Sequence, residues 1–287
     1  MSLAWSIPFG SLEYNLAVQL EHNLPDRERL SAVMVVVLLA YVASRFIAGP
    51  GETLALELAG IYLPLNLNIN TAIALLAAGL TATGTDWLLL SDPSSAGRSR
   101  FRHWLLPAMT AWVLSLPLAN LPLNGRWWLA LALCAFFLLA VVLAEFASST
   151  SENRYYGFAT QALSILPLGL FLILAITTRA VALRLYLALP AVGLGVLMAS
   201  SRLQLLRAGQ RWQPIQIAGI TFICIQVAAA LHYLPVSALG YGVALLGLLY
   251  ALNHYLGALN TGEALGQRIR EALISLAVFW ALALILA

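Results

Sequence analysis

Nine long apolar segments dominate the pattern of hydrophobic and polar positions along the chain. They lie at roughly 31–48, 70–90, 103–122, 127–147, 157–178, 181–201, 214–233, 236–256 and 270–287. A helix needs about twenty apolar residues to cross the hydrocarbon core of a bilayer. The pattern therefore predicts an all-α integral membrane protein, built as a bundle of about nine transmembrane helices over residues 31–287.

Two segments depart from this pattern. Within residues 1–30, leucines recur four positions apart from Leu12 to Leu24, with acidic residues between them. This spacing predicts an amphipathic helix that lies in the membrane interface. Residues 51–68 are only moderately apolar and are broken by glycine and by Pro64. Because that segment is too short and interrupted to span, we expect a re-entrant or interfacial piece there.

The basic residues give the predicted spans a direction. All fifteen are arginines. If the N-terminus is cytoplasmic, eleven of them fall on the cytoplasmic side of the spans and four fall outside, namely Arg45, Arg126, Arg179 and Arg184. Cytoplasmic loops of membrane proteins carry such an excess of basic residues. We therefore expect the N-terminus inside the cell and the C-terminus outside.

Composition narrows the possible classes of protein. The chain is 61% hydrophobic and only 9% charged, whereas a soluble domain carries roughly 25% charged residues. A cytosolic enzyme, a nucleic-acid-binding module and a disordered protein are thereby excluded. The absence of lysine excludes Schiff-base chemistry. Cys134 and Cys224 lie far apart in apolar runs, so they predict neither a disulfide nor a zinc site.

Polar and ionisable side chains gather near the predicted cytoplasmic ends of several spans. They are Asp86, Glu145, His103, His254, Asn253 and Arg154. Such a group could bind a metal or a lipid phosphate, or relay protons. In the alternative interpretation, each side chain simply ends its helix at the headgroups, as long charged side chains usually do. The sequence contains no metal-binding motif, so we favour the alternative and expect no metal.

A thinner polar set belongs to the predicted outer side. Arg184 falls a few residues inside the sixth span and requires a partner, for which Glu57 is the candidate. A structural ion pair is the favoured interpretation over a substrate site. His232 and His254 are the histidines placed deeply enough to act as a single axial ligand for haem or a pigment. Since they belong to opposite membrane faces, we expect no bis-histidine haem and no other cofactor.

Three stretches carry a resemblance to known proteins. They are ALLAAGLTATGTDWLLLSDP (Ala74–Pro93), RHWLLPAM (Arg102–Met109) and WWLALALCAFFLLAVVLAEF (Trp127–Phe146). These stretches resemble a family of uncharacterised bacterial polytopic membrane proteins, known as a domain of unknown function. The resemblance implies a multi-pass protein of the bacterial inner membrane. It implies no activity and no catalytic residue.

Three functions stay open at this point. The favoured one is a non-catalytic accessory or scaffold subunit that packs with lipids, with other membrane subunits or with further copies of itself, and not with nucleic acid. The second is an enzyme that processes a lipid phosphate or isoprenoid at the cytoplasmic polar group. The third is a transporter of a small solute, suggested by prolines inside the spans such as Pro107 and Pro167. Whether the protein is an enzyme is undecided, and the lack of a catalytic motif favours the first function.

Overall fold

The computed structural model describes residues 25–47, 52–58, 61–67, 69–90, 101–149, 156–207, 213–259 and 265–287. The described part contains nine helices and two strands: α2 (Arg27–Phe46), β1 (Glu52–Leu58), β2 (Ile61–Leu67), α3 (Ile69–Leu89), α4 (Phe101–Asn120), α5 (Gly125–Ser149), α6 (Tyr156–Ala180), α7 (Leu185–Arg207), α8 (Pro214–His232), α9 (Ala238–Leu259) and α10 (Leu265–Ile285). The predicted number of helices is thus confirmed. The predicted amphipathic helix of residues 1–30 lies mostly outside the described residues, which begin at residue 25.

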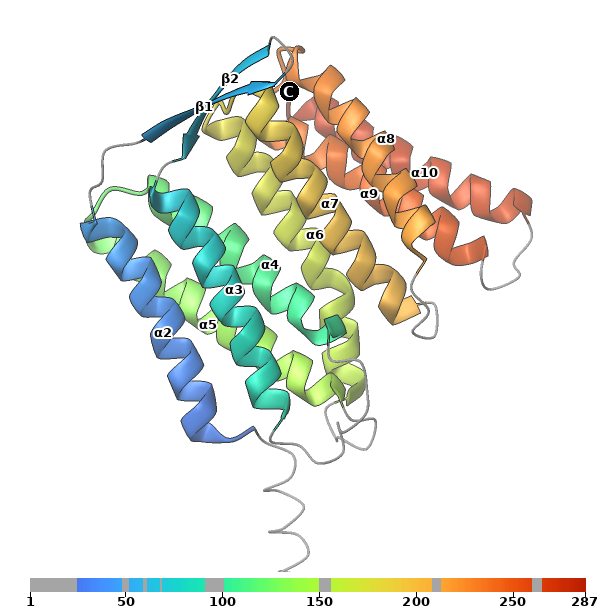
Figure 1. Ribbon diagram of the computed structural model, residues 1–287. Coiled ribbons are helices and arrows are strands. Elements are labelled where there is room, and N and C mark those ends of the chain that lie inside the picture. The colour runs from blue at the N-terminus through green and yellow to red at the C-terminus, as the bar shows by residue number, and fades with distance from the viewer. Residues whose placement is uncertain are drawn as a thin grey trace, which may run out of the picture.

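Successive helices run in opposite directions along one bundle (Figure 1). Helices α2, α4, α6, α8 and α10 end at the side of the two strands, which we call the hairpin end, and the other helices begin there. We call the opposite side the polar end. Among the described helices, seven are long and apolar enough to cross a membrane. Helices α4 and α10 are not among the seven, and both carry charged or polar residues in their first turns, including His103 and Arg268.

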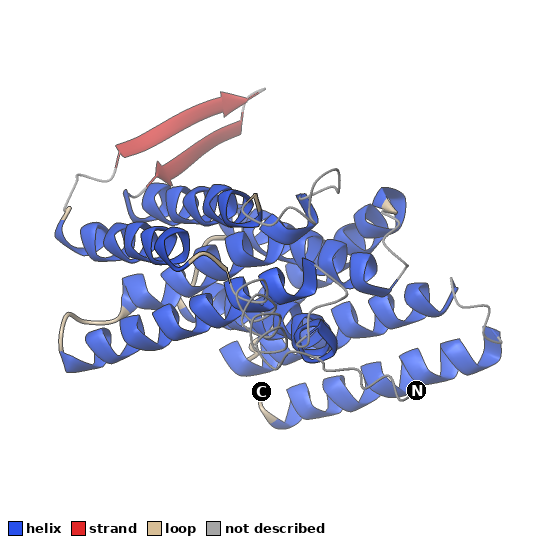
Figure 2. Ribbon diagram, turned by 90° about the horizontal axis from the view of Figure 1, so that it is seen from below, coloured by secondary structure: helices blue, strands red, loops and turns tan. Residues whose placement is uncertain are grey.

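The segment expected to be re-entrant or interfacial forms an antiparallel β-hairpin, which the sequence analysis did not predict. Strand β1 pairs with β2 from Glu52 opposite Leu67 to Leu58 opposite Ile61. Leucines recur at every second position in β2, the periodicity of a strand with one apolar face. The hairpin lies outside the helical bundle, as the two red arrows in Figure 2 show.

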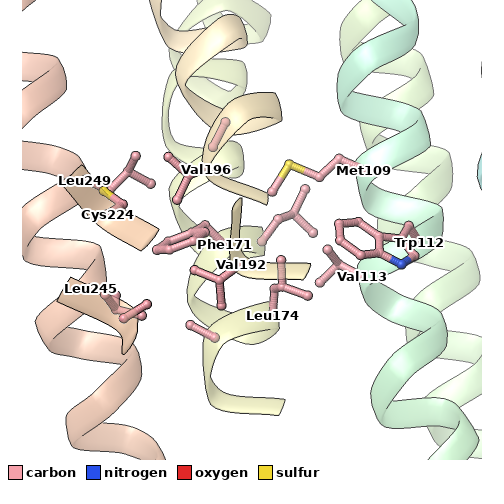
Figure 3. Packing of buried hydrophobic residues seen from close by; sticks show 14 of the residues in the cluster. Met109, Trp112, Val113, Phe171, Leu174, Val192, Val196, Cys224, Leu245 and Leu249 are labelled. Atoms are coloured by element: carbon pink, nitrogen blue, oxygen red, sulfur yellow. The ribbon is translucent and has the colours of Figure 1, made fainter. Parts of the chain in front are cut away.

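The hydrophobic core has two main parts. The larger part joins α4 to α6, α7, α8 and α9, and Figure 3 shows Phe171 and Leu174 of α6 packed between α4 and α9. The second part lies among α2, α3, α4 and α5 and contains the fully buried rings of Tyr41 and Trp127. Helix α4 contributes to both parts. It therefore connects the N-terminal four helices to the rest of the bundle.

Candidate functional site

A buried carboxylate organises the polar end. Glu145, near the end of α5, is fully buried. Its Oε2 atom lies 2.8 Å from Nδ1 of His103 on α4 and accepts a hydrogen bond of 2.6 Å from Nη2 of Arg202 on α7. Burying a charge without a partner is costly, so these contacts stabilise the carboxylate where it lies. Among the described residues, Oε1 has no hydrogen-bond partner.

Asp86 lies beside this cluster, on α3. Its Oδ1 accepts a hydrogen bond of 3.2 Å from Nε1 of Trp104, the residue that follows His103 on α4. One residue further along α3, the carbonyl of Trp87 accepts a hydrogen bond of 3.0 Å from Arg29 of α2. The polar residues at this end thus connect α2, α3, α4, α5 and α7.

The other two described residues of the predicted cluster belong to a separate set of contacts. Asn253 of α9 is buried and donates from Nδ2 to Oγ of Ser200 on α7 at 3.1 Å. Nε2 of His254 lies 3.8 Å from Oε2 of Glu271 on α10. His254 is therefore paired with α10, while His103 is paired with Glu145. Arg154, the remaining predicted member, lies outside the described residues.

Three partners at the polar end were not predicted from the sequence: Arg202, Ser200 and Glu271. The sixth span was predicted to end at residue 201, whereas α7 continues to Arg207. Arg202 was accordingly counted as a loop residue, although it is buried with a relative exposure of 3%. The burial of Arg202 could have been predicted from its position on the same face of the helix as the apolar residues that precede it.

The hairpin end contains a cavity of about 500 Å³ between α3, α4, α6 and α7. Its apolar wall includes Ala74, Trp112, Leu116, Leu187 and Ala191. Its polar wall includes Ser115, Asn120, Thr177, Thr178, Tyr186 and Arg184. A volume of this size falls within the range of roughly 300–1000 Å³ that is typical of sites for small molecules.

Arg184 lies at this cavity, in the turn between α6 and α7, and not inside a span as predicted. The reason is that α6 continues to Ala180 and α7 begins only at Leu185. Ala182 adopts a left-handed conformation with φ of 51°, and the N–H of Leu183 donates to the carbonyl of Thr178 at 3.4 Å. This is the geometry of a Schellman motif, which ends a helix sharply.

The predicted pairing of Arg184 with Glu57 stays a prediction. Glu57 belongs to β1, and its side chain lies outside the described residues. The side chain of Arg184 is exposed, and no hydrogen bond or ion pair of its guanidinium group involves a described residue.

Two other arginines at the hairpin end bind backbone carbonyls. Arg45 of α2 donates to the carbonyl of Ala119 at 3.1 Å and to that of Leu121 at 2.5 Å. Arg179 of α6 donates to the carbonyl of His232 at 3.1 Å, and to two further carbonyls in the turn between α8 and α9. These carbonyls lie at the ends of α4 and α8 or just after them, where intrahelical donors are lacking.

The two histidines considered as axial ligands lie at opposite ends of the bundle. His232 is the last residue of α8 at the hairpin end, and its ring packs edge-on against Tyr233 with centroids 5.8 Å apart. His254 lies near the end of α9 at the polar end. In the described part of the chain, no group of three or more His, Cys, Asp or Glu residues is arranged to hold a metal ion.

Comparisons with known proteins give a family and no assigned activity. No curated protein matches the chain, and no solved structure matches it. The family described as "Protein of unknown function (DUF5656)" matches residues 49–286, a range that contains both strands and every described helix except α2. The chain therefore belongs to this DUF5656 family of unknown function.

Proposed function

We propose that this protein is a non-catalytic, multi-pass accessory subunit of the bacterial inner membrane and that it binds a lipid at its hairpin end. In this proposal the nine helices span the bilayer, the polar end faces the cytoplasm and the hairpin end faces outward. The observation that carries the proposal is the cavity of about 500 Å³ between α3, α4, α6 and α7. Its described lining combines nine apolar residues with seven polar ones, and ligand sites usually join apolar walls to polar groups that orient the ligand.

Exposed apolar side chains support a lipid environment. Phe136 of α5, Ile165 of α6, Phe222 of α8 and Val278 of α10 each have a relative exposure above 60%. Soluble monomers rarely expose contiguous apolar patches of large area, because contact of such patches with water is unfavourable. Lipid chains are the natural contact for these faces.

The position of the cavity favours binding over transport. Its described lining comes from the first two turns of α3 and α7, from the last three turns of α4, from the last turn of α6 and from the turn that joins α6 to α7. All of these turns lie at the hairpin end (Figure 1). The cavity therefore supports a site that is entered from one side, rather than a path through the bundle.

A cavity-filling substitution tests lipid binding. We expect Ala191→Phe to reduce the lipid retained by the purified protein at least severalfold, measured by native mass spectrometry after extraction in mild detergent, because Ala191 lines the cavity. Ala132→Phe is the matched control, because Ala132 is exposed on α5 and does not line the cavity. Equal lipid retention by both variants and the parent protein would refute the proposal.

Cysteine labelling tests the proposed orientation. In a background with Cys134 and Cys224 replaced by alanine, we expect Arg126→Cys at the hairpin end to react with an impermeant maleimide applied to intact spheroplasts. Gln267→Cys, exposed at the polar end, should react only after permeabilisation. The reverse pattern of labelling would overturn the orientation.

A second candidate function rests on the contact between His103 and Glu145. A half-buried imidazole lies 2.8 Å from a fully buried carboxylate, and this arrangement could transfer protons at the headgroup level. The candidate is an enzyme that processes a lipid phosphate. Release of phosphate from a polyprenyl phosphate by the parent protein, and its loss in His103→Gln, would favour this enzyme over the accessory subunit. No release by the parent protein would exclude it.

A further inference from the structure

The charge at the cavity of the hairpin end carries an inference about its ligand, which rests on the lipid-binding function proposed above. Four described arginines lie at this end: Arg45, Arg126, Arg179 and Arg184. Arg45 and Arg179 are bonded to backbone carbonyls, and Arg126 is exposed and does not line the cavity. Arg184 differs from the other three because it lines the cavity.

The described surroundings of Arg184 do not neutralise its charge. No Asp or Glu is among the described residues that line the cavity. Arg184 directly precedes α7, whose first turn contains no acidic residue, and the N-terminus of a helix carries a partial positive charge. The arginine and the helix dipole thus both favour an anion at the same place. A charged side chain and a cavity thus coincide with the N-terminus of α7.

The polar groups near Arg184 add hydrogen-bonding capacity without negative charge. Thr177 and Thr71 contribute hydroxyl groups to the lining, and Asn120 contributes an amide. The lining also includes Trp112 and Leu116 of α4, which lie further from the hairpin end of this helix than Asn120 does. A molecule that fits this gradient has an anionic group at one end and an apolar chain at the other.

We infer that the cavity at the hairpin end selects an anionic lipid, with its phosphate at Arg184 and an acyl chain along Trp112 and Leu116. A guanidinium group presents several N–H donors in a planar fork that matches phosphate oxygens. Hydrogen bonds to charged groups are stronger than those between neutral groups. Because a zwitterionic headgroup carries the same phosphate but adds a cation that Arg184 repels, Arg184 is the residue that distinguishes an anionic from a zwitterionic headgroup.

The test compares two lipids with the same chains, phosphatidylglycerol and phosphatidylcholine. Full-length protein in neutral detergent is titrated with each lipid, and binding is followed by native mass spectrometry. We expect the parent protein to prefer phosphatidylglycerol by about tenfold, because the choline group of phosphatidylcholine brings a positive charge close to Arg184. Arg184→Gln should abolish the preference, because it weakens the binding of phosphatidylglycerol more than that of phosphatidylcholine. Arg126→Gln is the matched control and should retain the preference, since its side chain is exposed at the same end away from the cavity.

Each other outcome has a distinct meaning. If Ala191→Phe weakens both lipids and Arg184→Gln weakens neither, the lipid-binding function stands and the selectivity for anions is wrong. If Ala191→Phe changes nothing, the lipid-binding function itself fails. Inorganic phosphate is added in a separate arm, and binding of phosphate alone with the affinity of the lipid would overturn the assignment to a lipid. If Glu57 neutralises Arg184, the parent protein will show no preference and Glu57→Gln will create one, which would also overturn the inference.

Discussion

The two ends of the bundle use polar side chains in different ways. At the polar end, side chains from different helices bond to one another, as Arg202 and His103 do with Glu145. At the hairpin end, arginines bond to backbone carbonyls, as Arg45 and Arg179 do. The carbonyl of a residue at a helix end needs a donor whatever that residue's side chain is, whereas a buried carboxylate needs suitable side chains at particular positions. The polar end therefore depends more strongly on residue identity than the hairpin end.

The ends also differ in how completely their buried polar atoms are satisfied. Among the described residues, buried side-chain atoms without a hydrogen-bond partner include Oε1 of Glu145, both polar atoms of Gln204, Oδ1 of Asn253 and Nε of Arg268. All four residues lie near the polar end. Each unsatisfied buried group lowers stability, by roughly 1–3 kcal/mol for a neutral one. Among the described residues, this energetic cost falls on the polar end.

The largest expected effect comes from removing the carboxylate at the polar end. We expect Glu145→Leu to lower the free energy of unfolding in detergent micelles by about 3 kcal/mol or more, because it leaves Arg202 buried without this partner. The measurement is chemical denaturation followed by tryptophan fluorescence. In the double variant Glu145→Leu with Arg202→Leu, most of the loss should be recovered, since neither charge of this pair stays buried. Additive losses in the double variant would show that the pairing is not what stabilises this end.

A smaller loss in the free energy of unfolding is expected from a substitution at the hairpin end. Arg179→Gln removes hydrogen bonds to the carbonyls of His232, Leu234 and Val236, at 3.1, 3.0 and 3.4 Å. Because this site is partly open to solvent, we expect a loss of about 1–2 kcal/mol in the same assay. Arg126→Gln, whose side chain is exposed, should change the free energy of unfolding by less than about 0.5 kcal/mol. If Arg179→Gln costs more than Glu145→Leu, the contrast between the two ends is wrong.

The helices could be predicted from the sequence because a run of about twenty apolar residues is typical of a helix that crosses a membrane. Helix α8 was predicted at 214–233 and is found at Pro214–His232. The prediction failed where tertiary contacts override composition. Helix α7 extends to Arg207 past the polar residues Arg202 and Gln204, and the contact of Arg202 with Glu145 stabilises that extension.

The candidate sites could be predicted only in part. The ends of antiparallel spans indicate which residues share a membrane face, so Glu145 and His103 were grouped from the sequence. Which helices are neighbours on that face is set by packing, so the pairing of His254 with Glu271 was not foreseen. The cavity at Arg184 was not foreseen either, because it depends on how α3 and α4 meet α6 and α7.

A gain in stability is expected at the polar end from removing an unsatisfied group. Both side-chain polar atoms of Gln204 are buried without a partner among the described residues. Gln204→Leu is similar in size and needs no hydrogen bond, so we expect the free energy of unfolding to rise by about 1 kcal/mol. Thermal denaturation in the same detergent measures this change. A loss of stability would show that Gln204 has a partner in the membrane, such as water or lipid. It would then count against the proposed difference between the two ends in how many buried polar atoms lack a hydrogen bond.

The smallest expected effect concerns the turn that carries Arg184. Ala182 adopts a left-handed conformation with φ of 51°, which is unfavourable for a residue with a Cβ atom and ordinary for glycine. We expect Ala182→Gly to raise the free energy of unfolding by about 0.5 kcal/mol, because the relief of strain slightly exceeds the added chain entropy of the unfolded state. Ala180→Gly, at the last residue of α6, is the matched control and should lower stability instead. Ala182→Val should lower it more than the control, since a β-branched side chain tolerates this conformation least. If Ala182→Gly and Ala180→Gly change stability equally, the left-handed turn does not decide how α6 ends, and the position of Arg184 at the cavity must depend on packing alone.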